Sequence, residues 1–315
     1  MKSQNKLLVN GSLVLLIASL IVFYWMTQEP ISLNDGHPFD AQSYYNMAEQ
    51  ASLGEPISEL SPFAYRFALP YVVGKLSPGD IDKGFKIANI GFGILTIGLL
   101  YIYIGRFVTS SLIALFSILL YVVNPHSPFR FTHLVSTYTD PPALFFVLLL
   151  LFLSSFVVRM NVKWLVLVSI VGVVGVIFRE IALCGLLVFS FTQCAKLKRK
   201  APYIEFSSIP RQYLSLLALV PAIVALIATH MLIDGRGSYT YSSHIVAVLG
   251  YLADEPGGYL LSWFTAFGCI PIIVVLLHNK SLLNFLGHNQ SILIFLMGSA
   301  ILPLISGFHT DRISY

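Results

Sequence analysis

Long apolar runs separated by short polar segments make up most of this chain. The first run, Leu7–Met26, has about 20 residues, which is enough to cross roughly 30 Å of hydrocarbon at 1.5 Å per residue. No small-x-small cleavage site follows it, so it is expected to be an uncleaved first span. The later runs predict spans at Ile87–Ile104, Val108–Val123, Asp140–Val158, Trp164–Phe178, Ile181–Ala195, Tyr213–Ile233, Tyr259–His278 and Gln290–Phe308. The pattern therefore predicts an all-α polytopic membrane protein with about nine transmembrane helices, forming a single transmembrane domain over residues 1–315.

Composition agrees with a membrane protein. The chain has 315 residues, of which 56% are hydrophobic and 11% charged, with a mean hydropathy of +0.78. A soluble domain has about 25% charged residues. The net charge of +4 is small, and the one dense basic cluster, residues 196–200, directly follows an apolar run. Such a cluster is typical of a cytoplasmic flank, so nucleic acid is excluded as a partner and membrane lipid is the expected surroundings.

Charged residues also predict the orientation. With a cytoplasmic N-terminus, the short inner segments hold eleven of the 19 Lys and Arg residues, and the longer outer segments hold eight. Of the 15 acidic residues, only Glu205 falls on the inner side. The expected topology has two large extracytoplasmic loops, residues 27–86 and 234–258. We expect a multi-pass protein of a bacterial inner or plasma membrane whose functional face is extracytoplasmic.

The longest polar segment, residues 34–70, lies in the first outer loop. Asp40, Tyr44 and Ala48 are spaced i, i+4, i+8, which predicts a short amphipathic helix over Phe39–Ala51 with these three on one face. At the membrane surface this helix would hold Asp40 at the mouth of a cavity enclosed by the spans. The alternative is that Asp40 only caps the helix or stabilises its first turn.

Two arginines occur in apolar surroundings. Arg66 lies among aromatic and aliphatic residues, where an unpaired cation is costly, so we expect a carboxylate or a phosphate as its partner. Arg179 and Glu180 interrupt an apolar stretch between two segments of about 15 residues each. They are expected to line a cavity, or else to form a turn pair at the outer boundary.

Further charged residues are expected on the same face. Asp140 begins a span on its outer side, where it could equally serve as a helix-start residue before Pro141. Asp311 and Arg312 repeat the acid–base pairing after the last predicted span. The eight His residues show no HxxxH or HExxH spacing and the three Cys lie within or at the ends of apolar runs, so no metal site is predicted, although a divalent cation is left open as a cofactor.

These features resemble the GT-C superfamily of integral-membrane glycosyltransferases. The resemblance is carried by the strings Phe39-Asp40-Ala41-x-x-Tyr44-Tyr45-x-x-Ala48, Phe63-Ala64-Tyr65-Arg66-Phe67-Ala68-Leu69-Pro70, Thr139-Asp140-Pro141 and Arg179-Glu180-Ile181-Ala182-Leu183. It implies a polyprenyl-phosphate sugar as donor and a catalytic Asp in the first outer loop, which maps onto Asp40 with Asp35 as the fallback. It also implies roles for an acidic residue at the head of a later span, here Asp140, and for the pair Arg179 and Glu180. Many relatives have further spans, whereas this chain stops just after Arg312, and the loop lacks the Asp-Glu pair of the protein mannosyltransferase branch.

The sequence is therefore expected to encode a hexosyltransferase of the inverting type, acting on a glycan or lipid acceptor. Asp40 would be the general base, and a set of further residues would bind the lipid-linked donor: Tyr44, Arg66, Asp140, Arg179, Glu180, Asp311 and Arg312. Two alternatives share the same charged residues. One is a transporter or flippase of lipid-linked sugars, disfavoured by span interiors that are nearly free of charge and by the lack of matched repeats. The other is a polysaccharide polymerase or ligase using lipid-diphosphate donors.

Overall fold

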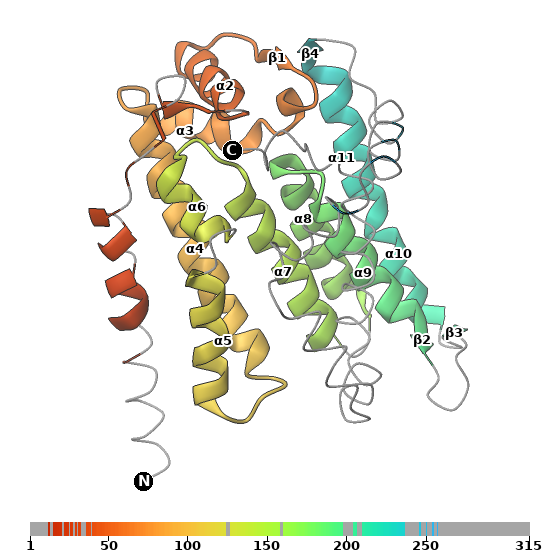
Figure 1. Ribbon diagram of the computed structural model, residues 1–315. Coiled ribbons are helices and arrows are strands. Elements are labelled where there is room, and N and C mark those ends of the chain that lie inside the picture. Colours follow the sequence, from red (N-terminus) through yellow and green to blue (C-terminus); the bar gives the residue numbers. More distant parts are fainter. Residues whose placement is uncertain are drawn as a thin grey trace.

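Helices run roughly side by side between two ends of the molecule in the computed structural model (Figure 1). It describes residues 40–123, 127–157, 160–197, 204–206 and 210–236, with scattered positions from 12 to 38 and from 246 to 257. Of the first predicted span, residues 15–20 and 22–24 are helical. The predicted spans Tyr259–His278 and Gln290–Phe308 lie outside the described residues.

The predicted second and third spans form α4 (Ile81–Ile104) and α5 (Ser111–Val123). Helix α4 begins earlier than its apolar stretch, because the Asp80 side chain accepts a hydrogen bond from the Lys83 backbone N–H, 3.1 Å away, and caps the helix. Helix α4 therefore has a polar first turn that precedes the apolar run predicted to begin at Ile87. The connection after α5 contains a further short helix, α6 (Pro128–Leu134).

Helices α7 (Asp140–Phe156), α8 (Val162–Phe178) and α9 (Ala182–Cys194) occupy the predicted fourth, fifth and sixth spans. Helix α7 begins with prolines in its first turn, where no backbone N–H donor is needed. Buried side chains of the three helices form the largest apolar core, which includes Leu150, Val168, Leu186 and Phe189. This core packs α7, α8 and α9 against one another.

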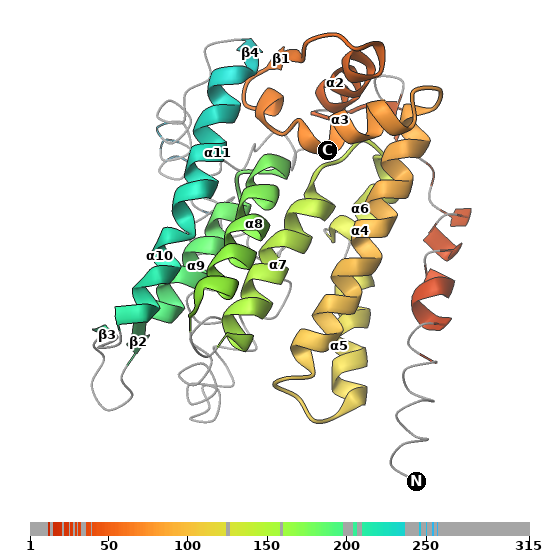
Figure 2. The ribbon, with the colours of Figure 1, turned by 180° about the vertical axis from the view of Figure 1, so that it is seen from behind.

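The predicted seventh span is divided at Ala218 into α10 (Leu214–Leu217) and α11 (Leu219–Leu232). Pro221 has no N–H to donate to the carbonyl four residues before it, and the helix is interrupted at this point. Helix α11 packs on α8 and extends to the end of the molecule where α2 lies (Figure 2).

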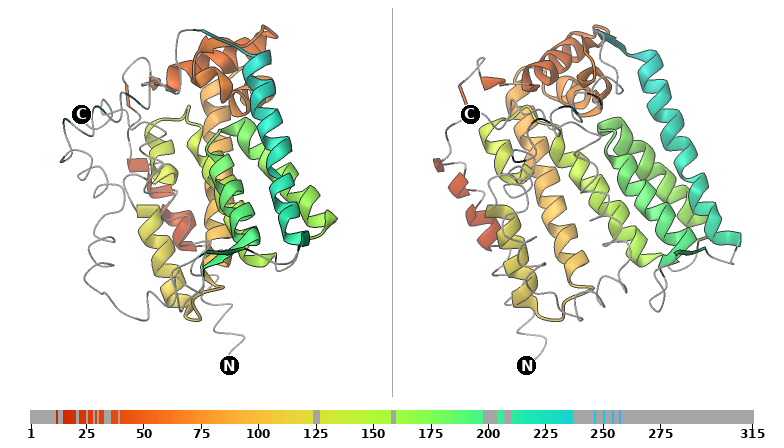
Figure 3. Two further views of the ribbon diagram at one scale, coloured as in Figure 1. Left: turned by 90° about the vertical axis from the view of Figure 1, so that its right-hand side faces the viewer. Right: turned by 45° about the vertical axis from the view of Figure 1, so that its right-hand side comes forward.

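A layer of short elements lies across that end of the bundle, and we call it the cap layer. It consists of α2 (Ala41–Leu53), β1 (Ser58–Leu60), the 3-10 turn η2 (Phe63–Tyr65), α3 (Ala68–Leu76) and β4 (Asp234–Arg236). Figure 3 shows the layer from two further sides. The amphipathic helix predicted over Phe39–Ala51 is confirmed as α2, which ends at Gly54 in the left-handed conformation.

Two close contacts fix the cap layer. A β-carbon on Gly74 of α3 would overlap the Ala48 carbonyl oxygen of α2, so these helices touch at their backbones. Strands β1 and β4 pair in parallel, with Ser58 opposite Asp234, and the Ser61 N–H donates to the Arg236 carbonyl oxygen at 2.8 Å. The pairing joins the first predicted outer loop to the start of the second.

The opposite end of the bundle carries the α4–α5 connection and the antiparallel pair β2 (Ala195–Leu197) and β3 (Ile204–Phe206) (Figure 1). After β3, the 3-10 turn η3 (Pro210–Tyr213) leads into α10. Segments assigned by the charge pattern to different sides of a membrane thus lie at different ends of the molecule.

Among the described residues, two helices are long and apolar enough to cross a membrane: Ile81–Ile104, with 24 residues, and Leu214–Leu232, with 19, which comprises α10 and α11 taken together. Only 28% and 22% of their most apolar stretches are buried, so most of these side chains face outward. Large apolar side chains are also exposed on α5 and α11, among them Phe116 and Val224. Helices α5, α7, α8 and α9 are shorter, with 13 to 17 residues. The nine-span topology stays a prediction.

Candidate functional site

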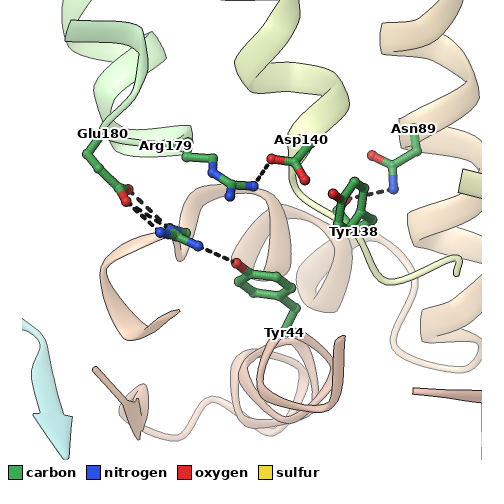
Figure 4. A network of polar contacts seen from close by, with 7 residues as sticks. Tyr44, Asn89, Tyr138, Asp140, Arg179 and Glu180 are labelled. Atoms are coloured by element: carbon green, nitrogen blue, oxygen red, sulfur yellow. Dashed lines mark hydrogen bonds and ion pairs between the residues drawn. The ribbon is translucent and has the colours of Figure 1, made fainter. Parts of the chain in front are cut away.

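Arg66 joins the cap layer to the helical bundle. Its Nε donates to both Glu180 carboxylate oxygens, at 3.1 and 3.2 Å, and its Nη2 donates to Glu180 Oε1 at 2.6 Å. Its Nη1 donates to the Tyr44 hydroxyl oxygen at 3.1 Å (Figure 4). Helix α2, the link between η2 and α3, and the link between α8 and α9 therefore meet at one guanidinium. The side chains of Arg66 and Glu180 are 12% and 26% exposed. The prediction that Arg66 requires an anionic partner is confirmed, and the partner is Glu180.

Arg179 forms a second ion pair beside the first. Its Nη1 donates to Asp140 Oδ1, which links the end of α8 to the first residue of α7. Arg179 is in an extended conformation directly after α8, so its charge lies near the negative end of that helix dipole, and Asp140 lies near the positive end of the α7 dipole. The dipole of α8 therefore stabilises the positive charge of Arg179, and the dipole of α7 stabilises the negative charge of Asp140.

The two pairs form one electrostatic unit with two positive and two negative charges. Burial by itself raises the pKa of Glu180, but the charge and hydrogen bonds of Arg66, with a further contribution from the charge of Arg179, outweigh this effect and lower that pKa to about 2. Burial by itself lowers the pKa of Arg66, but Tyr44 and Glu180 raise that pKa well above its usual value. Glu180 and Arg66 are therefore both charged at neutral pH.

Asp40 lies one helical turn before Tyr44 on the same face of α2. The residue is 6% exposed, and Tyr44 is fully buried. Asp40 occupies the position before the helix, but its side chain makes no capping hydrogen bond to the described helix backbone. A capping hydrogen bond therefore does not explain why a carboxylate is buried here. The other part of the alternative, stabilisation of the first turn through the helix dipole, stays a prediction.

A second set of polar contacts links the turn before α2 to α4 and to the connection between α6 and α7. The sequence analysis did not predict it. His37 Nε2 lies 3.7 Å from Asp82 Oδ2, and Asp82 Oδ1 accepts a hydrogen bond from the Ser136 hydroxyl at 2.9 Å. The Asn89 side-chain amide donates to the carbonyl oxygen of Ser136 at 2.9 Å and to that of Tyr138 at 2.8 Å, and Figure 4 shows the contact with Tyr138. The available signal was Asn89 itself, an amide within the apolar run of α4.

Five of the predicted site residues are brought together: Tyr44, Arg66 and Glu180 in direct contact, and Asp140 and Arg179 beside them. Asp40 is adjacent through its helix. Asp311 and Arg312, as well as the fallback Asp35, lie outside the described residues. Within the described part of the chain, no group of three or more His, Cys, Asp or Glu side chains could hold a metal ion.

No protein-family model, no curated protein and no solved structure matches this chain. Its function is therefore inferred from its residues and their geometry.

Proposed function

We propose that this protein is a GT-C-like membrane glycosyltransferase that moves a sugar from a polyprenyl-phosphate donor to a lipid or glycan acceptor. The observation that carries the proposal is the buried carboxylate of Asp40, one helical turn from the Tyr44–Arg66–Glu180 contact and not used for capping. A general base must be close to bound substrate, and the charged groups around Asp40 suit a phosphate-bearing one.

In the proposed reaction, an acceptor hydroxyl attacks the anomeric carbon of the donor sugar while the Asp40 carboxylate takes the hydroxyl proton. The bond between the anomeric carbon and the phosphate oxygen breaks, and its electron pair stays with the polyprenyl phosphate. A single displacement of this kind inverts the anomeric configuration. The leaving phosphate gains negative charge, so a nearby cation stabilises the transition state.

The two arginines differ in what they can offer to that phosphate. The guanidinium of Arg66 is engaged along both of its edges, by Glu180 and Tyr44. Arg179 uses only Nη1 in a hydrogen bond to the described residues, and Nε and Nη2 remain for a ligand. We therefore assign phosphate binding to Arg179, with Arg66 holding α2 against the bundle. Glu180 and Asp140 fix the two guanidinium groups in place.

The membrane setting is part of the proposal. Two helices in the described part of the chain are apolar and long enough to cross a bilayer, and the cap layer lies at the end of the molecule opposite the α4–α5 connection and the β2–β3 pair. A lipid-linked donor would enter from the bilayer with its phosphate at the level of the cap layer. We propose a multi-pass arrangement in which this end is extracytoplasmic, as favoured by the distribution of Lys and Arg.

The test is a transfer assay with purified protein in detergent, comparing a polyprenyl-phosphate hexose with the corresponding polyprenyl-diphosphate sugar. We expect consumption of the monophosphate donor and a fall of about 10²-fold or more in kcat for Asp40→Asn. Glu49→Gln is the matched control, because Glu49 is an exposed carboxylate on the same helix. Wild-type activity in a folded Asp40→Asn variant would refute the assignment of the base. Consumption of the diphosphate donor alone would instead indicate a polymerase or ligase.

The assignment of the two arginines has its own test. A lysine cannot reproduce the planar fork of arginine. We expect Arg179→Lys to raise KM for the donor without lowering the unfolding temperature as far as Arg66→Lys, which should mainly destabilise the fold. The reverse pattern would show that Arg66 is the phosphate ligand.

A further inference from the structure

Helix α3 of the cap layer has an exposed side that is largely apolar. Tyr71 is 45% exposed, Val72 42% and Leu76 77%. Lys75 is exposed as well, and its Nζ lies 5.8 Å from the centroid of the Tyr71 ring. Single exposed apolar residues are ordinary, but three large ones beside a cation on a helix of nine residues form a contact surface.

Helix geometry gives the direction of this surface. The Gly74 side of α3 touches α2, because a β-carbon on Gly74 would overlap the Ala48 carbonyl oxygen. Val72 and Leu76 each lie two positions from Gly74, which is about 200° around an α-helix, so both point away from α2. Figures 1 and 2 show α2 on the side of α3 that is turned away from the bundle. Val72 and Leu76 therefore point from the cap layer toward the level of the bundle helices.

Helix α3 is also fixed relative to α4. A β-carbon on Gly84 of α4 would lie 2.8 Å from side-chain atoms of both Val73 and Ser77, so the two helices pack closely at their junction. The outward apolar side chains of α4 begin at Ile87, which is 62% exposed, and continue with Leu95, which is 55% exposed. Helix α4 is long and apolar enough to cross a membrane. A close-packed corner thus joins the apolar surface of α3 to a candidate membrane span.

We propose that α3 is an interfacial membrane helix that lies in the headgroup region of the bilayer. Val72 and Leu76 enter the boundary of the acyl chains, Tyr71 lies among the headgroups, and the Lys75 amine contacts lipid phosphates. A lysine stem that covers apolar surface while its charge stays in the polar region is typical of such helices, and tyrosine is enriched at this depth. The direction of Val72 and Leu76, along the candidate span, favours lipid over a protein partner.

This contact sets the depth of the candidate site in the membrane. Because α2 and α3 touch at their backbones, the position of α3 in the bilayer also fixes that of Tyr44 on α2. Arg66 lies two residues before α3 and contacts Tyr44, so it is held at the same level. The inference rests on the proposed membrane setting and not on the proposed transfer reaction.

The experiment places a tryptophan on α3 of the full-length protein in nanodiscs of phosphatidylcholine and phosphatidylglycerol. Leu76→Trp is compared with Leu53→Trp, because Leu53 is a leucine with 67% exposure at the end of α2. The fluorescence of the native tryptophans, measured on the wild type, is subtracted. We expect a lipid with a doxyl group near its headgroup to quench Leu76→Trp about twofold more than Leu53→Trp, since an interfacial helix reaches about 5–10 Å into this boundary. Acrylamide, which stays in water, should quench the two variants in the reverse order.

Equal quenching of the two variants by the doxyl lipid, or stronger quenching of Leu76→Trp by acrylamide, would overturn the interfacial position. Lys75→Glu, added to Leu76→Trp, tests the charge. It should weaken lipid quenching more in discs with phosphatidylglycerol than in discs of phosphatidylcholine alone, and an equal change in both would overturn the role of Lys75. No transfer reaction enters these measurements, so an active Asp40→Asn variant would remove the proposed function and leave this contact intact.

Discussion

Replacing Glu180 with glutamine removes one charge from the buried pair with Arg66 and keeps the side-chain shape. The pKa of Glu180 falls from an ordinary 4.5 to about 2. At 1.36 kcal/mol for each tenfold change in proton affinity, the folded state favours the carboxylate by about 3 kcal/mol. Removing one partner of a buried ion pair costs about 3 to 5 kcal/mol in general, which agrees. We expect Glu180→Gln to lower the free energy of unfolding by about 3 kcal/mol at pH 7.

The sign of the pH dependence follows from the lowered pKa. Because the folded protein holds the Glu180 proton less tightly than the unfolded chain, the stabilisation is complete above pH 4.5 and disappears as the pH falls toward 2. The difference between wild type and Glu180→Gln should therefore shrink to about 1 kcal/mol at pH 3. Both proteins also share every other titrating group, so those groups cancel in the comparison.

Thermal unfolding in detergent at pH 7, 4.5 and 3 measures this difference. A loss of about 3 kcal/mol corresponds to a fall of about 6 to 12 °C in Tm. Glu55→Gln is the control, since Glu55 is exposed, and it should stay within about 0.5 kcal/mol of wild type. A Glu180→Gln variant as stable as wild type at pH 7, or a difference that does not shrink by pH 3, would refute the ion-pair reasoning.

Two further substitutions test the contacts that hold the cap layer. Tyr44→Phe removes the hydroxyl that accepts from Arg66, and because this hydrogen bond involves a charged group, unfolding should be easier by about 1.5 to 3 kcal/mol, measured by the same thermal assay. Gly74→Ala would force a β-carbon against the Ala48 carbonyl oxygen and should cost about 1 to 3 kcal/mol, whereas Gly79→Ala, with open space around it, should be nearly neutral. Equal Tm values for the two glycine variants would show that α2 and α3 are not in backbone contact.

Periodicity and length were enough to predict most helices. The α2 helix followed from the spacing of Asp40, Tyr44 and Ala48, and the bundle helices followed from their apolar runs. The start of α4 did not, because its first turn is polar and is stabilised by the Asp80 cap rather than by apolar burial. The strands β1 and β4 have only three residues each, too few to show an alternating pattern.

Five of the predicted site residues lie together in the structure, but which of them pair with one another was not predicted. A lone arginine among apolar neighbours indicates that Arg66 needs an anion, yet nothing local identifies Glu180, which is 114 residues away. The same limit applies to Arg179, which pairs with Asp140, 39 residues away in the chain. Long-range partners depend on how the helices pack, and packing is decided by side-chain shapes that a hydropathy pattern does not record.

The parallel pairing of β1 with β4 has a consequence for biosynthesis. Arg236 Nε donates to the Ser58 hydroxyl oxygen across 178 residues of chain, and both strands belong to the cap layer. A ribosome adding 5 to 20 residues per second needs about 10 to 35 s to reach β4 after it has made β1. Glu180 is also synthesised 114 residues after Arg66, so for part of that interval the nascent cap layer carries an arginine without its final counter-ion. Chaperone contact or premature proteolysis of this protein should therefore concentrate on residues 40–80 while the second half is still being made.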